Sequence, residues 1–305
     1  MTLTKGCIYD DILRWCKAFI TECKALNFSK NTLSTYQRQI LTFADYCEEV
    51  DELTLKNIKQ MNISHFFVWL DERISPKNAT RAGYLRTLKS FFNFISKNND
   101  DEVNYSFLFK SYKIKFKKGE KKTIKYFTPS EMTKILEFLD ERKELRKYEI
   151  VRNSLLIKLM YFAGLRISEA LNLKLCDFEK DGEFYKMSIL AKGGEIQEAF
   201  IKIEHIIREM DYFKSEFDKN SYIFLGKNRI RRLTRETAYH ILEHIYKAIG
   251  LNKRGCHILR HAFAVGLVDK QINLSIIQKA LRHKSINTTM IYAESTNDIV
   301  KQALK

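Results

Sequence analysis

Residues 256–261 have the sequence CHILRH, residues 281–283 have the sequence LRH, and residues 291–292 have the sequence IY. A phosphodiester under attack gathers negative charge on its non-bridging oxygens, and arginine and histidine side chains can neutralise that charge. The phenol of Tyr292, nine positions after His283, can attack the phosphorus and hold the broken strand as a phosphotyrosine. These segments therefore predict a site that breaks a nucleic-acid backbone without a metal ion.

A third basic motif, GLRISE, lies upstream at residues 164–169. Arginine is always charged and its planar fork can bind two phosphate oxygens at once. Arg166 and Arg260 are accordingly the predicted phosphate clamps. Glu169 is expected to orient these arginines, because no second carboxylate accompanies it in a metal-ligand pattern.

These motifs resemble the tyrosine recombinase (phage integrase) family, with a layout similar to that of Xer-type bacterial recombinases. The resemblance rests on residues 164–169, 257–261 and 281–283 and on Tyr292, which occur in the family's order. It is sharp over residues 126–305 and diffuse before them.

Three positions depart from the family pattern. Arg282 stands where glycine is usual, Cys256 where proline is common, and Ala262 where threonine or serine is usual. These departures affect the expected loop conformation, but no catalytic position is missing.

The resemblance assigns a role to each predicted catalytic residue. It implies that Arg166 and Arg260 contact the scissile phosphate, that His257 is a general acid or base, and that His283 binds the phosphate or steadies the nucleophile. Lys192 matches the family's hairpin lysine and is the candidate acid for the departing 5′ oxygen, which leaves slowly unless it is protonated.

His261 matches the second histidine of the family's HxxRH string. It lies directly beside Arg260 in the sequence, so on a helix its side chain is expected to project in another direction. A packing role is therefore predicted for His261.

The composition is that of a globular, strongly basic protein. The chain has 305 residues, 45% of them hydrophobic, and a net charge of +16. This length allows two domains, and such a charge indicates a polyanionic partner, although a merely soluble basic protein stays possible. The six cysteines show no short paired spacing, so we expect reduced thiols and neither zinc nor disulfides. We also expect no membrane span and no secretory signal, hence a cytoplasmic protein.

Residues 1–110 have the pattern of an all-helical domain. Apolar residues at helical spacing predict helices over residues 8–26, from Ser29 onward, and over residues 63–72. Ser75-Pro76 is the predicted start of a fourth helix, with serine as N-cap and proline at the first helical position.

Residues 111–125 are the predicted interdomain linker. From Lys110 to Lys125 the chain has eight lysines and one acidic residue, and basic and apolar residues alternate. The strip could follow a phosphate backbone or be a solvated tether. The tentative DNA-binding residues are Lys115, Lys117, Lys118, Lys121 and Lys122.

Residues 126–305 are the predicted catalytic domain, mainly α with a small antiparallel sheet. The sequence TPSE at residues 128–131 predicts a capping box, and Gly164 suits the end of a helix over residues 151–162. Residues 184–190 and 195–203 form the predicted strands of a hairpin around Lys192-Gly193-Gly194.

The resemblance implies a site-specific recombinase whose SAM-like helical domain and catalytic domain close on double-stranded DNA as a C-shaped clamp. It implies a 3′-phosphotyrosyl intermediate at Tyr292, a Holliday junction, and four subunits joined on two sites by exchange of C-terminal tails. No cofactor, metal or ATP is implied. The expected role is chromosome dimer resolution in a bacterial cytoplasm, at the nucleoid, with a DNA translocase as a candidate regulatory partner.

Three alternatives remain at this point. The chain could be an integrase or excisionase of a phage or mobile element, a type IB topoisomerase, or a DNA-binding regulator that no longer cuts. A regulator has no use for Tyr292, and the helical N-terminal domain and compact size argue against a topoisomerase.

Overall fold

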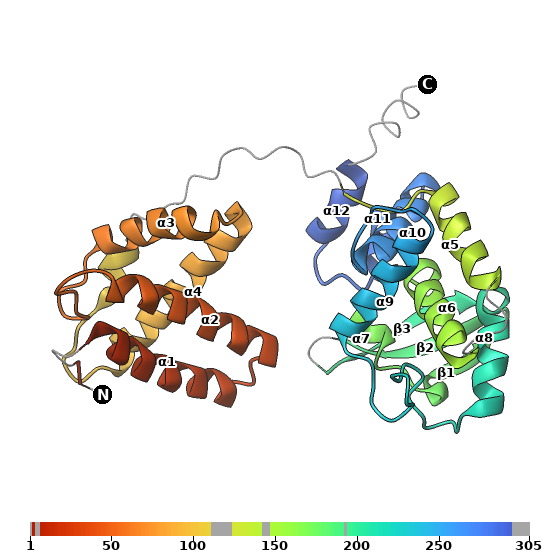
Figure 1. Ribbon diagram of the computed structural model, residues 1–305, viewed down its shortest axis with the longest axis horizontal. Helices are drawn as coiled ribbons and strands as arrows, with labels where there is room; N and C mark the ends of the chain where they lie inside the picture. The colour runs from red at the N-terminus through yellow and green to blue at the C-terminus, as the bar shows by residue number, and fades with distance from the viewer. Residues whose placement is uncertain (1, 4–6, 111–123, 142–146, 192–193, 295–305) are drawn as a thin grey trace. The chain divides into compact units, whose positions relative to one another are not determined.

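The structure is a computed structural model, and it describes residues 2–3, 7–110, 124–141, 147–191 and 194–294. The chain forms two compact units, Met1–Glu120 and Lys121–Lys305 (Figure 1). Each unit has its own cluster of buried apolar side chains. The five tentative DNA-binding lysines of the predicted linker lie outside the described residues.

The first unit is all-helical, as predicted. It contains α1 (Ile8–Ala25), α2 (Lys30–Glu48), α3 (Gln60–Ile74), α4 (Asn78–Asn98) and the short 3-10 helix η1 (Tyr105–Phe109). Aromatic rings dominate its core, and the fully buried ones include Trp15, Phe43, Phe66, Phe67, Phe91 and Phe92. Edge-on ring pairs such as Phe43 with Phe66, at 5.1 Å between centroids, stabilise this core beyond the burial of their area.

Two helix N-caps were predicted in this unit, at Ser29 and at Ser75, and only the first is confirmed. Ser29 is the N-cap of α2, and its hydroxyl accepts a hydrogen bond from the amide of Thr32 at 3.2 Å. The N-cap predicted at Ser75 is wrong. Ser75 closes α3 in the left-handed conformation, with φ at 39°, and cannot also adopt the extended conformation of an N-cap. Helix α4 therefore begins only at Asn78.

The second unit is mainly helical with one small sheet, as predicted. The three strands β1 (Phe178–Asp181), β2 (Phe184–Leu190) and β3 (Ile196–Lys202) are antiparallel in the order β1-β2-β3. The helices are α5 (Pro129–Glu141), α6 (Lys147–Phe162), α7 (Ile167–Ala170), η2 (Leu175–Asp177), α8 (Ile203–Glu216), α9 (Arg235–Ala248), α10 (His257–Asp269), α11 (Leu274–Ala280) and α12 (Asn287–Glu294).

Two local predictions in this unit are confirmed. The amide of Thr128 donates to the Glu131 carboxylate at 2.8 Å, and the amide of Glu131 donates back to the Thr128 hydroxyl at 3.3 Å, which is a capping box. Strands β2 and β3 form the predicted hairpin, and Gly194 in its turn has φ at 85°. Lys192 and Gly193 lie outside the described residues.

Helix α6 forms the centre of the second unit. It packs against both α8 and α10, and its consecutive residues Leu155, Leu156 and Ile157 are fully buried. This arrangement places the segment after α6 beside α10. Helix α10 begins at His257, the second residue of the sequence CHILRH. No helix among the described residues is both long and apolar enough to cross a membrane.

Gly164 lets the chain leave α6 close against α10. Its φ is 59°, and a Cβ atom added there would lie 2.4 Å from the ring of Phe263. A side chain at this position would meet both an unfavourable backbone conformation and a steric clash.

We therefore expect Gly164→Ala to destabilise the second unit by about 2 kcal/mol or more. Urea unfolding followed by far-UV circular dichroism measures the effect. Gly182→Ala is the matched control, because Gly182 has φ at 57° with open space around it and should cost only about 1 kcal/mol. Trp15 and Trp69 are the two tryptophans of the chain, so tryptophan fluorescence reports the first unit and should not change. Equal losses in the two variants would contradict the steric argument.

Candidate active site

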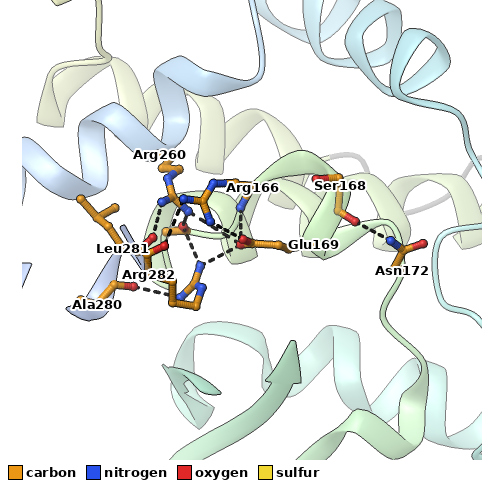
Figure 2. A network of polar contacts seen from close by, with 9 residues as sticks. Arg166, Ser168, Glu169, Asn172, Arg260, Ala280, Leu281 and Arg282 are labelled. Atoms are coloured by element: carbon orange, nitrogen blue, oxygen red, sulfur yellow. Dashed lines mark hydrogen bonds and ion pairs between the residues drawn. The ribbon is translucent and has the colours of Figure 1, made fainter. Parts of the chain in front are cut away.

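The Glu169 carboxylate is the centre of a cluster of three arginines (Figure 2). Its Oε1 accepts a hydrogen bond from Nη1 of Arg166 at 2.6 Å, and its Oε2 accepts one from Nη2 of Arg282 at 2.9 Å. Nη1 of Arg260 lies 3.7 Å from Oε2. The backbone amide of Arg166 also donates to Oε2, at 2.8 Å. One buried carboxylate thus orients all three guanidinium groups, as expected for Glu169.

Backbone carbonyls complete the coordination of these arginines. The carbonyl of Gly164 accepts hydrogen bonds from both Arg260 and Arg282, and the carbonyl of Leu281 accepts one from Arg260. The carbonyl of Arg282 accepts one from Nη2 of Arg166 at 3.2 Å. The loop after α6, helix α10 and the loop after α11 are therefore tied together by arginine side chains, although they are far apart in the sequence.

The cluster carries more positive than negative charge. Burial, together with the neighbouring charges of Arg166 and Arg282, lowers the pKa of Arg260 to about 9, so its guanidinium stays charged at neutral pH. Burial alone would raise the pKa of Glu169, but the arginines and the amide of Arg166 outweigh it and the pKa is lowered. Three cations then face one anion, which suits an anionic ligand such as a phosphodiester.

Arg166 is the member of this cluster that a ligand can reach most easily. Its side chain is 35% exposed, whereas those of Arg260 and Arg282 are each 4% exposed. Arg166 precedes the short helix α7 and the Glu169 contact fixes its orientation. A phosphate bound here would meet a guanidinium that is already oriented, which reduces the entropic cost of binding.

Arg282 is a member of the arginine cluster that the sequence predicted only as a departure from the family pattern. Its φ is 53°, which explains why a glycine is suited to this position. Its buried side chain bonds to Glu169, to the Gly164 carbonyl and to the Ala280 carbonyl. The signal in the sequence was a third arginine directly before His283.

His257 and His283 lie in the positive field of the arginines. Burial, and then the charges of Arg260 and Arg166, lower the pKa of both, that of His283 to about 4. Nδ1 of His283 is 2.9 Å from the hydroxyl of Thr289 on α12, which fixes the ring. Both imidazoles are therefore neutral at pH 7 and can each donate and accept a hydrogen bond.

Tyr292 lies on α12 with its side chain in the protein interior, 2% exposed. Burial raises the pKa of its phenol, while the charges of Arg260 and Arg166 act in the opposite direction. The hydroxyl is therefore protonated at neutral pH and lies within the electrostatic reach of the two predicted phosphate clamps.

His261 was predicted to pack away from the site, and this is wrong. Its Nδ1 is 2.7 Å from the Tyr292 hydroxyl. His257 and His261 are four residues apart on α10 and so share a face of that helix, with ring centroids 6.5 Å apart. The prediction considered only the neighbouring Arg260 and missed this spacing.

The predicted acid, Lys192, lies outside the described residues, but Glu195, three positions later, lies close to the residue that follows His283. Glu195, directly after the hairpin turn, has its carboxylate 4.0 Å from the ammonium of Lys284, the residue that follows His283. Both side chains are exposed, so the pair adds little stability. The pair shows that Glu195 lies beside the loop that follows α11.

The chain is similar to known proteins over most of its length. The Phage integrase family profile matches residues 125–298, and the profile of the phage integrase N-terminal SAM-like domain matches residues 17–99. The tyrosine recombinase XerH of Helicobacter pylori is 30% identical, over 99% of this chain and 85% of that protein.

Two solved structures of XerH are also similar to this chain. The pre-cleavage complex of XerH with its difH substrate has a TM-score of 0.78 at 26% identity and covers 100% of this chain and 98% of that one. The post-cleavage complex with a palindromic difH substrate has a TM-score of 0.76 at 29% identity and covers 98% and 84%, respectively.

The contacts of Glu169 lead to a prediction about stability and pH. Glu169→Gln should lower the free energy of unfolding of the second unit by about 3 kcal/mol at pH 7, because it leaves buried guanidinium groups without their counter-ion. The pKa of Glu169 is lower in the folded chain than in the unfolded one, so its contribution exists above the unfolded pKa and is lost as pH falls through the folded pKa. The difference between wild type and variant should therefore shrink below about pH 4.3.

Urea unfolding at several pH values measures this difference. Glu183→Gln is the control, because Glu183 is exposed and its nearest partner, Lys202, is 3.9 Å away, so its loss should have almost no effect. A Glu169 effect that does not change between pH 7 and pH 3 would contradict the electrostatic explanation.

Proposed function

This chain belongs to the phage integrase family and is a tyrosine recombinase of the Xer type, and we propose that Tyr292 is its nucleophile. The observation that carries this proposal is the position of the Tyr292 hydroxyl within the field of Arg166 and Arg260, both oriented by Glu169. Fixed guanidinium donors are what a phosphoryl transition state requires.

The proposed reaction conserves the energy of the phosphodiester. The Tyr292 oxygen attacks the phosphorus, a 3′-phosphotyrosine forms, and the 5′ oxygen leaves with a proton from Lys192. Arg166 and Arg260 bind the non-bridging oxygens, and His257 and His283 donate hydrogen bonds to the same phosphate. Attack of a 5′ hydroxyl on the phosphotyrosine then reverses these steps and rejoins the DNA, so no ATP is consumed.

The remaining parts of the chain are proposed to hold and pair the DNA. Residues 1–110 bind one face of the site, the lysines of the linker follow its phosphates, and the tail after α12 docks into a neighbouring subunit to form a tetramer on two sites. Residues 295–305 of that tail lie outside the described residues. XerH has been crystallised on its difH substrate before and after cleavage, which supports a duplex recombination site as the partner of this chain.

Chromosome dimer resolution in a bacterial cytoplasm is the biological role that we favour over integration of a mobile element. The support is the similarity to Xer proteins, such as the 30% identity to XerH of Helicobacter pylori. A non-cutting regulator would have no use for the Tyr292 hydroxyl, and the helical first unit and the compact size of the chain argue against a topoisomerase.

Tyr292→Phe tests the nucleophile. The target site is first isolated by enriching genomic DNA fragments that bind the Phe variant, and a nicked duplex of that site then traps covalent product. We expect wild type to give a protein–DNA band on a denaturing gel, and Tyr292→Phe to bind the duplex with a similar Kd but to give no band. Tyr239→Phe, a tyrosine on α9, is the control and should behave as wild type. A covalent band from Tyr292→Phe would place the nucleophile elsewhere.

The role of the linker is tested by replacing its five tentative DNA-binding lysines with glutamine. Each lost phosphate contact should reduce the slope of log K against log salt by about 0.9. Binding should weaken equally on specific and unrelated duplexes, because phosphate contacts carry no sequence information. Unchanged affinity and slope in a salt titration would show that the segment is only a tether.

A further inference from the structure

The hydrogen bond between His261 and Tyr292 gives the predicted nucleophile a partner for its proton. The Tyr292 hydroxyl lies 2.7 Å from Nδ1 of His261, and the two ring centroids are 5.6 Å apart. Burial raises the pKa of the Tyr292 phenol, so the phenol is still protonated when it meets the phosphate. Tyr292 must therefore lose this proton as it attacks. A group at hydrogen-bonding distance from that hydroxyl is in the position that a general base requires.

The charge state of His261 allows this role. Burial, followed by the charges of His257 and Arg260, lowers its pKa to about 4. The ring is therefore neutral at pH 7, and one of its two nitrogens has a free lone pair. A phosphodiester bound at Arg260 would add negative charge nearby and raise the pKa of His261, which makes it a stronger base when substrate is present.

The two other histidines of the site are less suited to this step. Nδ1 of His283 is already engaged with the hydroxyl of Thr289. The hydrogen bond of the Tyr292 hydroxyl described above runs to His261, and His257 lies one helical turn earlier on α10, with its ring centroid 6.5 Å from that of His261. Of the three histidine rings, that of His261 is therefore the one placed to act on the nucleophile, and those of His257 and His283 are assigned to the phosphate.

We propose that His261 is a further catalytic residue, the general base that takes the proton of Tyr292 during cleavage. In its resting tautomer the ring carries hydrogen on Nε2, and Nδ1 accepts the phenol hydroxyl. As the bond between the Tyr292 oxygen and phosphorus forms, the proton moves to Nδ1 and the bond between phosphorus and the 5′ oxygen breaks. On rejoining, the imidazolium returns the same proton to the phenolate, so no proton is consumed at this end of the reaction.

This inference rests on the proposed function, and its test separates the two. His261→Gln keeps an oxygen that can accept a hydrogen bond but cannot take up a proton. His261→Phe removes both abilities. His240→Gln, a histidine on α9, is the control. Covalent adduct formation is timed for each on the nicked duplex, made with either oxygen or sulfur as the bridging 5′ leaving atom, while gel shift and circular dichroism verify binding and folding.

His261→Gln should slow adduct formation by about 10²- to 10³-fold on both duplexes, and His261→Phe by at least as much. A sulfur leaving group does not need a proton, so it should restore cleavage to Lys192→Ala but not to His261→Gln. His240→Gln should match wild type.

Three results would overturn the role of His261. The first is a cleavage rate of His261→Gln within about twofold of the wild-type rate. The second is a His261→Gln rate that the sulfur duplex restores, which would place the proton transfer at the leaving group. The third is a His261→Gln rate above that of wild type, which would mean that the hydrogen bond holds Tyr292 in an inactive position. If wild type itself forms no adduct on either duplex, the proposed function fails instead.

A second measurement compares two forms of Tyr292 within the same histidine variant, after circular dichroism has verified that the variant is folded. Replacing Tyr292 with a ring-fluorinated tyrosine makes the phenol more acidic without changing its position. The penalty of His261→Gln should then become smaller, because a more acidic phenol depends less on a base. An identical penalty with both tyrosines would also contradict the proposal.

Discussion

The candidate active site depends on one interaction, the contact of the buried Glu169 carboxylate with the guanidinium groups of Arg166, Arg260 and Arg282. Three buried or half-buried cations could not be held this close without a counter-ion, because their repulsion and desolvation would separate the segments that carry them. The carboxylate therefore stabilises the fold and also fixes the directions in which the arginines point. An excess of positive charge remains for a phosphate.

The contacts around this carboxylate explain how distant segments form one site. Helix α6 packs against both α8 and α10, and Gly164 ends it so closely against α10 that its carbonyl can accept hydrogen bonds from Arg260 and Arg282. Helix α12 then adds Tyr292, which bonds to His261 on α10. Packing thus sets the positions of the elements, and the polar contacts set the orientations of the reactive groups.

Much of this arrangement could be predicted from the sequence, because local patterns determine it. The helical periodicity of residues 8–48, the capping box at Thr128 and the β2–β3 hairpin all depend on neighbouring residues. The failures have non-local causes. Ser75 ends one helix instead of starting the next, and the roles of Arg282 and His261 depend on partners 113 and 31 residues away.

The central claim is that the arginine cluster activates a phosphate for attack by Tyr292, and the chemical identity of the covalent adduct tests it most directly. Adduct trapped on a nicked duplex is digested with nuclease and trypsin, and the peptides are fragmented in a mass spectrometer. The account predicts a nucleotide 3′-phosphate attached to the phenol of Tyr292, in the tryptic peptide of residues 285–301. A nucleotide on any other side chain, or a 5′-phosphate linkage, would contradict it.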